Sequence, residues 1–431
     1  MAEAVAKSAI SKVKRFLIPY MFLLYVINFL DRVNLGFAAL KMNKDLGLSA
    51  EQFGFAAGIF FIGYLIFQVP SNLMLHKIGA RVWISLILVI WGFVATLTGF
   101  ANSPVHLYIA RFLLGLAEAG FFPGVILFLT YWFPQRELAQ AVALFMTALA
   151  FSSVIGSPIS GIILDHVHWA GLESWRWLFI LEGAPAVIFG ILTFFILPNK
   201  PSEAKFLTQQ ERDWLTNEIA QEQAEKAKQQ KMTVGEAMKN GRVWLLAFIY
   251  FFGLIMGLYS ISFWLPQIIK GLSKSYSAQT VGFLAMIPFL FAAIMMVVNG
   301  SSADKKAEWR YHTQIPLLVS SIAIFAMLFI KTPAPSIIVL SIVTAGAYAA
   351  FGPFWALPNK FLSGAAAAAG IAVINSIGNL GGFFAPYIIG FIKSHTGNVY
   401  YGLAAVGVSL LISVILLALL PKEATQGVKQ Y

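Results

Sequence analysis

The stretch HLYIARFLLGLAEAGFFPG, residues 106–124, decides the fold class. Its apolar composition predicts a helix that crosses a membrane, yet it contains Arg111 and Glu118, seven residues apart. Seven residues make two helical turns, so both charges lie on one face, roughly 10 Å apart along the axis. Ionisable groups at this depth cost at least ~2.5–3.5 kcal/mol each, and they normally face a polar cavity and mark an ion or substrate path.

A second acid–base pair, Asp31–Arg32, interrupts the first apolar stretch of the chain. Both pairs lie in the N-terminal half, and the C-terminal half has no charge inside a predicted span. An ion pair that only ties helices together is an alternative explanation for a single pair. Two pairs gathered in one half favour a functional site.

The composition excludes a soluble protein. Of the 431 residues, 59% are hydrophobic and only 11% are charged, whereas soluble domains have about 25% charged residues. The net charge of +11 does not indicate a nucleic-acid partner, because the basic residues lie between apolar segments and therefore indicate topology. The chain has no cysteine, which excludes disulfides and thiolate chemistry, and its six histidines show no metal-ligand spacing, so we expect no metal site.

Twelve apolar stretches are long enough to cross a bilayer, which needs roughly 17–25 residues. A polar segment follows the sixth apolar stretch and divides the twelve into six and six. This layout predicts an all-α membrane protein of two pseudo-symmetric six-helix bundles, residues 1–198 and 243–431. The linker, residues 199–242, contains strong helix formers at 208–230, which predict a short helix near the membrane surface. The spans are predicted at about 16–38, 53–75, 82–101, 105–130, 139–164, 176–197, 243–268, 279–300, 313–331, 336–358, 362–391 and 398–420.

Lys and Arg counts predict the orientation, because cytoplasmic loops are enriched in these residues. With a cytoplasmic N-terminus, 21 of the 30 Lys and Arg fall on the cytoplasmic side and seven on the other. Both termini are therefore expected in the cytoplasm. No small-residue cleavage site precedes Asp31, so a retained first helix is expected rather than a signal peptide.

Helix geometry also predicts which charges share a height in the membrane. Asp31 lies roughly 22 Å from the cytoplasmic side and Arg111 roughly 9 Å from the outer side, at ~1.5 Å per residue. Across a core of ~30 Å these depths nearly coincide. Asp31, Arg32 and Arg111 are therefore expected to share one cavity, with Glu118 on its inner side.

The C-terminal half is expected to add polar and aromatic side chains. Tyr259 and Trp355 can contact flat or polar groups, and Asn375 carries an amide that needs a partner inside a membrane. Glu182, in the first half, lies near the outer end of its span, where pairing with Arg176 or water is expected. Small residues that allow close helix packing recur in the fifth and eleventh spans, as Gly156, Pro158 and Gly161 and as Gly382, Pro386 and Gly390.

At this point the chain resembles the major facilitator superfamily and, within it, the anion:cation symporter family, in the tartrate, phthalate and hydroxyphenylacetate permease branch. The resemblance covers essentially the whole chain. It departs from the superfamily pattern in the loop after the second span, where Asn72 and His76 stand in place of Gly and Asp. The matching motifs are NFLDRVNLG (28–36), GYLIFQVPSNLML (63–75), KIGAR (77–81), RFLLGLAEAGFFPG (111–124), ESWRWLFILEG (173–183), FWLPQIIK (263–270) and FGPFWALP (351–358).

The resemblance implies proton-driven uptake of an organic acid by alternating access, in a bacterial inner membrane. Residues that match the family's proton carriers are Asp31 and Glu118, and its arginines match Arg32 and Arg111. Protons are then the only coupling ion and no cofactor is needed; the partners are a small organic anion and the bilayer. Each chain holds a complete two-half site, so a monomer is expected. The remaining binding positions match Tyr64, Trp355 and Asn375.

Residue chemistry supports the same function. A guanidinium group donates two parallel hydrogen bonds to a carboxylate, and an anion that engages it makes a neighbouring acid bind a proton more readily. An electroneutral exchanger or inorganic-anion transporter is the alternative. A sensor or intramembrane enzyme is a further one, but no nucleophile–base pair is visible. Phe354 and Trp355, with Gly352 in place of a hydroxyl residue, favour an aromatic or small hydroxylated dicarboxylic acid over a sugar acid.

Overall fold

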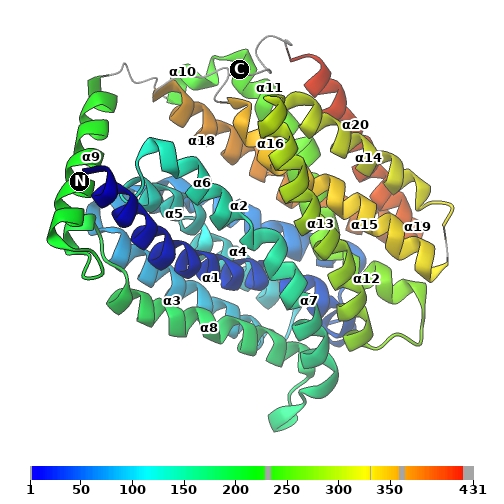
Figure 1. Cartoon of the computed structure of the whole chain (residues 1–431). Helices are drawn as coiled ribbons and strands as arrows, with labels where there is room; N and C mark the ends of the chain where they lie inside the picture. The colour runs from blue at the N-terminus through cyan, green and yellow to red at the C-terminus, as the bar shows by residue number, and fades with distance from the viewer. Residues whose placement is uncertain (1, 229–233, 331, 359–364, 421–431) are drawn as a thin grey trace.

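The computed structural model describes residues 2–228, 234–330, 332–358 and 365–420. All of its elements are helices, gathered into one bundle (Figure 1). Within the described residues, eleven continuous or broken helices are long and apolar enough to cross a membrane. The helix α14 (Arg310–Ala326) has 17 residues and completes the twelve spans. The predicted all-α membrane fold is therefore confirmed.

The first half contains two spans that are interrupted near their middle. The break between α4 and α5 follows Glu118 directly, at Ala119 and Gly120. A Cβ at Gly120 would lie 1.6 Å from Oγ of Ser71, so glycine lets the second span approach here. The elements are α1 (Ala2–Asp45), α2 (Ala50–Ile78), α3 (Ala80–Thr98), α4 (Pro104–Glu118), α5 (Phe121–Thr130), α6 (Gln135–Met146), α7 (Ala148–His166), η1 (Trp169–Gly171) and α8 (Ser174–Ile196).

The second half contains a π-helical segment, η3 (Tyr250–Ile255), in its first span. The carbonyl of Phe252 within it and that of Ile249 just before it accept hydrogen bonds from Ser409 and Ser413 of the last helix, at 2.7 Å and 3.0 Å. These bonds satisfy backbone groups that the π turn displaces. The elements are α11 (Gly241–Ile249), η3, α12 (Met256–Leu272), α13 (Ala278–Lys306), α14, α15 (Pro333–Ala349), α16 (Phe351–Ala356), α18 (Ala365–Asn379), α19 (Gly381–Thr396) and α20 (Val399–Ala418).

Helix α1 begins 14 residues before the predicted start at residue 16. Its first turns are rich in Ala and Lys, which favour helix, and Glu3 and Lys7 form an i,i+4 pair at 2.9 Å. The predicted span, 16–38, lies within α1, and the helix is longer because hydropathy detects only its apolar part. The predicted eleventh span, 362–391, begins partly outside the described residues.

The polar connection between the halves contains η2 (Pro201–Glu203), α9 (Gln209–Lys228) and α10 (Val234–Met238). Helix α9 lies beside the start of α1 (Figure 1), where Glu211 accepts hydrogen bonds from Ser8 at 2.6 Å and Lys12 at 2.9 Å. Burial raises the pKa of Glu211, but the bonds from Lys12, Ser8 and Thr208 outweigh it and hold the pKa to about 2. The predicted short helix is thus present, and it is fastened to the first half.

Glycines bring the two halves into backbone contact along two seams. In the first seam, α7 packs against α13, and a Cβ at Gly161 would lie 2.6 Å from the carbonyl oxygen of Ala278. In the second, α19 packs against α2, and a Cβ at Gly390 would lie 2.3 Å from the carbonyl oxygen of Ala50. Each seam therefore joins the end of one helix to the start of another across the halves.

The two seams are related by the sequence repeat SAEQFG (49–54) and SAQTVG (277–282). In each copy the serine side chain accepts a hydrogen bond at the helix start. In each copy the final glycine also faces a carbonyl of the other half, because a Cβ at Gly54 or Gly282 would lie 2.4 Å from it. The seams are thus equivalent contacts of two pseudo-symmetric halves.

A polar side chain closes each seam four residues after its glycine. Asp165 accepts from the backbone N–H of Gln279 at 2.7 Å, and Ser394 accepts from the backbone N–H of Glu51 at 2.9 Å. Because the twelve spans alternate in direction, Ala2 and the end of α20 lie at one end of the bundle. Both seams lie at the opposite end, which we call the distal end.

Candidate functional site

The centre of the site is an ion pair between α1 and α4. Arg32 Nη2 lies 2.8 Å from Glu118 Oε2, and Arg32 Nε donates to the same oxygen at 3.3 Å. Asn28, one turn before Arg32, donates a third hydrogen bond to this oxygen at 2.9 Å. All three side chains are buried. The pairing thus links the two charged stretches that the sequence singled out, but it joins Arg32 to Glu118 rather than to its neighbour Asp31.

Arg32 also connects the two halves. Its Nη1 donates to the hydroxyl of Tyr259, on α12, at 3.1 Å. Its guanidinium lies 5.1 Å from the ring centre of Phe60 and 5.3 Å from that of Tyr64, within the range of cation–π attraction. Tyr64 and Tyr259 are therefore in the cluster, as predicted, and Phe60 is a member that the sequence analysis missed.

Arg111 lies beside this cluster with unused donors. It is fully buried, its guanidinium lies 5.0 Å from the ring centre of Phe60, and Nη2 donates to the carbonyl of Arg32 at 3.5 Å. Its Nε and Nη1 have no hydrogen-bond partner in the described part of the chain. Unpaired buried donors are costly, so this place is suited to an acceptor that is negatively charged.

Asp31 makes its hydrogen bond on a different face of α1 from Arg32. Its Oδ2 accepts a hydrogen bond from Trp91 Nε1, on α3, at 2.6 Å, while its Oδ1 has no partner among the described atoms. Successive residues of a helix point about 100° apart, so Asp31 and Arg32 face different neighbours. The structure gathers Arg32, Arg111 and Glu118 as expected and places Asp31 on another face of α1.

Two predicted binding residues lie apart from the cluster. The ring of Trp355 lies 4.9 Å from that of Tyr250 and 5.3 Å from that of Phe354. Asn375 is half-buried and its backbone carbonyl accepts from Asn379 at 2.8 Å. Phe354 is fully buried and stacks on Tyr250, with ring centres 5.1 Å apart.

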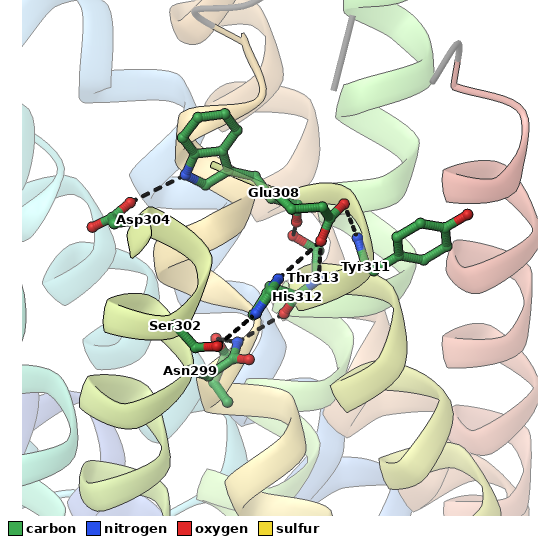
Figure 2. Close-up of polar contacts among 9 residues, drawn as sticks. Asn299, Ser302, Asp304, Glu308, Tyr311, His312 and Thr313 are labelled. Atoms are coloured by element: carbon green, nitrogen blue, oxygen red, sulfur yellow. Dashed lines mark hydrogen bonds and ion pairs between the residues drawn. The ribbon is translucent and has the colours of Figure 1, made fainter. Parts of the chain in front are cut away.

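The acids of the second half serve the turn between α13 and α14, as Figure 2 shows. Glu308 accepts from the backbone N–H of Tyr311 at 2.8 Å and from Nδ1 of His312 at 2.9 Å. Asp304 accepts from Nε1 of Trp309 at 3.1 Å. These bonds cap the start of α14, so the described acids of this half lie outside the central cluster.

A cavity of about 820 Å³ lies along α13, α14 and α15, next to this turn. Its walls are mostly apolar, with Phe291, Met295 and Ile315 among them. None of the predicted site residues lines it. It is therefore separate from the charged centre.

One buried acid was misplaced by the sequence analysis. Arg176 bonds to the carbonyls of Gly99 and Ala101 and lies 3.5 Å from Asp45. Glu182 instead accepts from Ser160 at 2.7 Å and is only 6% exposed. The predicted pairing with Arg176 was therefore wrong. The signal that could have found this contact is the serine on a facing span.

Known proteins similar to this chain are transporters. The Major Facilitator Superfamily profile matches residues 21–386. Two Agrobacterium vitis proteins, each named "Putative tartrate transporter", are 46% and 44% identical to it and cover 96% of it, with 91% and 95% of their own lengths aligned. A bacterial homolog to the human lysosomal transporter Spinster, solved inward-facing and occupied, shares the fold with a TM-score of 0.76 at 15% identity, covering 96% of this chain and 99% of that one.

The profile spans most of the chain and both relatives align over nearly their full lengths. These matches confirm the predicted family. The family and the relatives are transporters and not enzymes. The architecture agrees, with twelve spans and a polar cluster between the halves. The chain therefore belongs to the Major Facilitator Superfamily and is a secondary transporter.

Proposed function

We propose that this transporter carries an organic carboxylate anion together with protons across a bacterial inner membrane. The anion binds at Arg111 and Arg32, and Glu118 takes up a coupled proton. Asp31 is the second proton carrier, from its separate position on α1. The chain works as a monomer with both termini in the cytoplasm and needs no cofactor.

The unused donors of Arg111 carry this proposal. Two of its buried N–H groups lack acceptors among the described residues, and the group is always charged. Glu118 does not fill the place, because its bonded oxygen faces Arg32 and its Oε1 is also unpartnered. A substrate carboxylate supplies the missing acceptor and suits the planar geometry of a guanidinium.

Anion binding and protonation of Glu118 are coupled because the anion and the Glu118 carboxylate compete for the positive charge of the arginines. In the structure, Glu118 accepts hydrogen bonds from Arg32 and Asn28, and bonds of this kind favour the charged form of a carboxyl group. When an anion engages Arg32 or Arg111, part of that positive charge is neutralised, and protonation of Glu118 becomes more favourable. Linkage makes the effect reciprocal, so protonation of Glu118 also strengthens anion binding.

Alternating access uses the two halves, residues 1–198 and 243–431, as moving units joined by 199–242. The seams hold the distal end together, and the hydrogen bond from Arg32 to Tyr259 crosses between the halves beside the substrate place. Anion binding that draws Arg32 away from Tyr259 changes this contact. Such a change at the centre is a physical route from substrate occupancy to movement of the halves.

The proposed substrate is a small hydroxylated dicarboxylate or an aromatic acid. Two arginines favour an anion with one or two carboxylates. Gly352 has open space where a side chain would stand, and Trp355 is half-buried. Asn375 and Tyr64 are proposed to bond polar groups of the substrate once the halves move. The names of the two Agrobacterium vitis relatives support tartrate as the first probe.

The test is uptake into proteoliposomes with an alkaline interior. Tartrate, phthalate, hydroxyphenylacetate and galactonate are compared with and without the pH gradient and a protonophore. We expect at least one acid to accumulate against its gradient only while the pH gradient persists. Accumulation that instead requires an anion inside and ignores the pH gradient would establish an exchanger and contradict the proposal.

A further inference from the structure

A third buried carboxyl group lies outside the central cluster. Glu182, on α8, accepts a hydrogen bond from Ser160 Oγ, on α7, at 2.7 Å. Its other oxygen, Oε2, is buried and without a partner among the described atoms. We propose that Glu182 is a third proton-binding group of the transporter, which exchanges its proton with water when the halves separate at the distal end.

The surroundings of Glu182 disfavour its charged form. Helix α8 packs against α1, α3 and α7. On α1, Asp31 is close enough to interact with Glu182, and the two negative charges would repel. On α3, no titratable side chain follows Arg81, which lies at the far end of that helix.

The basic groups near the distal end are engaged elsewhere. Lys41, on α1, donates to the carbonyl of Leu164. Arg176 donates to backbone carbonyl groups and pairs with Asp45. On α7, His166 contacts Gln279. In the described part of the chain, the hydrogen-bonding groups beside Glu182 are therefore the neutral side chains of Ser160 and Asn34, and no cation pairs with it. A buried carboxylate without a cation is unfavourable, so the site is suited to a protonated carboxyl group.

A small cavity with both apolar and polar walls lies between Ser160, the hydrogen-bond donor to Glu182, and the contact between the halves. Its volume is about 10 Å³, roughly the room for one water molecule. Asn34, Ser157 and Ser160 line it from the first half, and Ser262 and Phe289 line it from the second. The first seam closes it, because the carbonyl of Ser157 lies against Gly282 and excludes a side chain there.

The arrangement makes protonation depend on closure of the seam. With the seam closed, Glu182 has no route to bulk water through this cavity. When α7 and α13 separate, water enters, the charged form is hydrated, and the proton passes from the carboxyl group to water. Protonated Glu182 therefore favours the closed distal end, and ionised Glu182 favours the open one. The link to transport rests on the proposed proton coupling, but the proton site itself does not.

Infrared absorption tests the proton site without any transported acid. Purified wild-type protein at neutral pH is compared with Glu182→Gln and with Glu173→Gln, a matched control whose side chain is exposed at the start of α8. We expect the carbonyl stretch of protonated carboxyl groups to lose intensity in Glu182→Gln and to stay unchanged in Glu173→Gln. An unchanged band in Glu182→Gln would overturn the proposal. Should that variant fail to fold, Ser160→Ala must shift the frequency of the same band, and an unshifted band would overturn it equally.

Distance measurements test the link to closure. The chain has no cysteine, so spin labels can be placed at Lys44→Cys and Lys274→Cys, two exposed positions at the distal end. We expect alkaline pH to raise the open population of the otherwise wild-type chain several-fold and to have a clearly smaller effect in Glu182→Gln. An equal response in both chains would overturn the linkage. This measurement contains no organic acid, so its outcome is independent of whether the proposed symport holds.

Discussion

The two halves repeat their contacts but not their charges. At the distal end, Gly161 and Gly390 meet backbone carbonyls in equivalent seams. At the centre, the first half supplies Arg32, Arg111 and Glu118, whereas Tyr259 is the second half's contact to Arg32. Equivalent seams therefore join the two halves at the distal end in the same way. In the proposed mechanism, charges confined to one half let substrate and proton bind to a single body while the other closes over it.

The largest expected effect is on uptake driven by a pH gradient, which should need the central acids but not an acid of the second half. Glu118→Gln should abolish accumulation driven by a pH gradient, because the coupled proton loses its carrier, and Asp31→Asn should do the same. Glu308→Gln alters only the cap of α14 and should keep the response to the pH gradient. Uptake into proteoliposomes measures all three. Full uphill uptake by Glu118→Gln would show that this acid is not a required carrier.

The next largest effect is on affinity for the transported acid, which should depend on one buried arginine and not on another. Arg32→Lys keeps its charge but loses the planar fork, so affinity for the transported acid should fall by about 1–3 kcal/mol. Arg310 donates to the carbonyls of Ala418 and Leu420 at the end of α20, and Arg310→Lys should leave affinity unchanged. Titration calorimetry on the purified proteins measures both. Equal affinities for wild type and Arg32→Lys would show that the planar guanidinium of Arg32 does not bind the transported acid.

The seams should respond alike to an added methyl group. Gly161→Ala and Gly390→Ala each place a Cβ against a backbone carbonyl, at 2.6 Å and 2.3 Å. Overpacking of this kind costs about 1–3 kcal/mol, and here it should populate the open distal end. Spin labels at Lys44→Cys and Lys274→Cys report the distance in both variants. A response in only one variant would break the equivalence of the seams.

The smallest effect distinguishes the caps of the two seams. Asp165 places a carboxylate at the start of α13, whereas Ser394 places a neutral hydroxyl at the start of α2. A negative charge at a helix start stabilises by about 0.3–1 kcal/mol, so Asp165→Asn should open the distal end about two- to fivefold. Ser394→Ala should open it in a salt-independent manner. The same labels show whether added salt weakens the first contact only, and identical salt responses would contradict the distinction.

The sequence predicted the fold well because membrane spans have a strong local signal. Hydropathy identified twelve spans, and the recurrent Gly161 and Gly390 proved to lie at equivalent contacts. The start of α1 was missed because its first turns are polar helix formers outside the apolar window. Asp31 and Arg32 bond to different neighbours, since adjacent residues on a helix face different directions.

Site membership was predictable where depth and charge decided it. Arg32, Arg111 and Glu118 are close in space, as the depth of each on its helix indicated. The partners of Asp31 and Glu182 were not predictable, because they depend on how α3 and α7 rotate against their neighbours. Trp355 and Asn375 were placed in the site by side-chain chemistry and by the resemblance, and their role stays a prediction.

The central claim is that anion binding and protonation of Glu118 strengthen each other. The most direct test is the affinity of the purified protein for whichever acid the uptake panel selects, measured across the neutral pH range for wild type and Glu118→Gln. Since binding favours the protonated form, wild-type affinity should rise as pH falls, approaching tenfold per pH unit for one coupled proton. Affinity of Glu118→Gln should be nearly independent of pH. A flat wild-type profile, or the same slope in both proteins, would contradict the account.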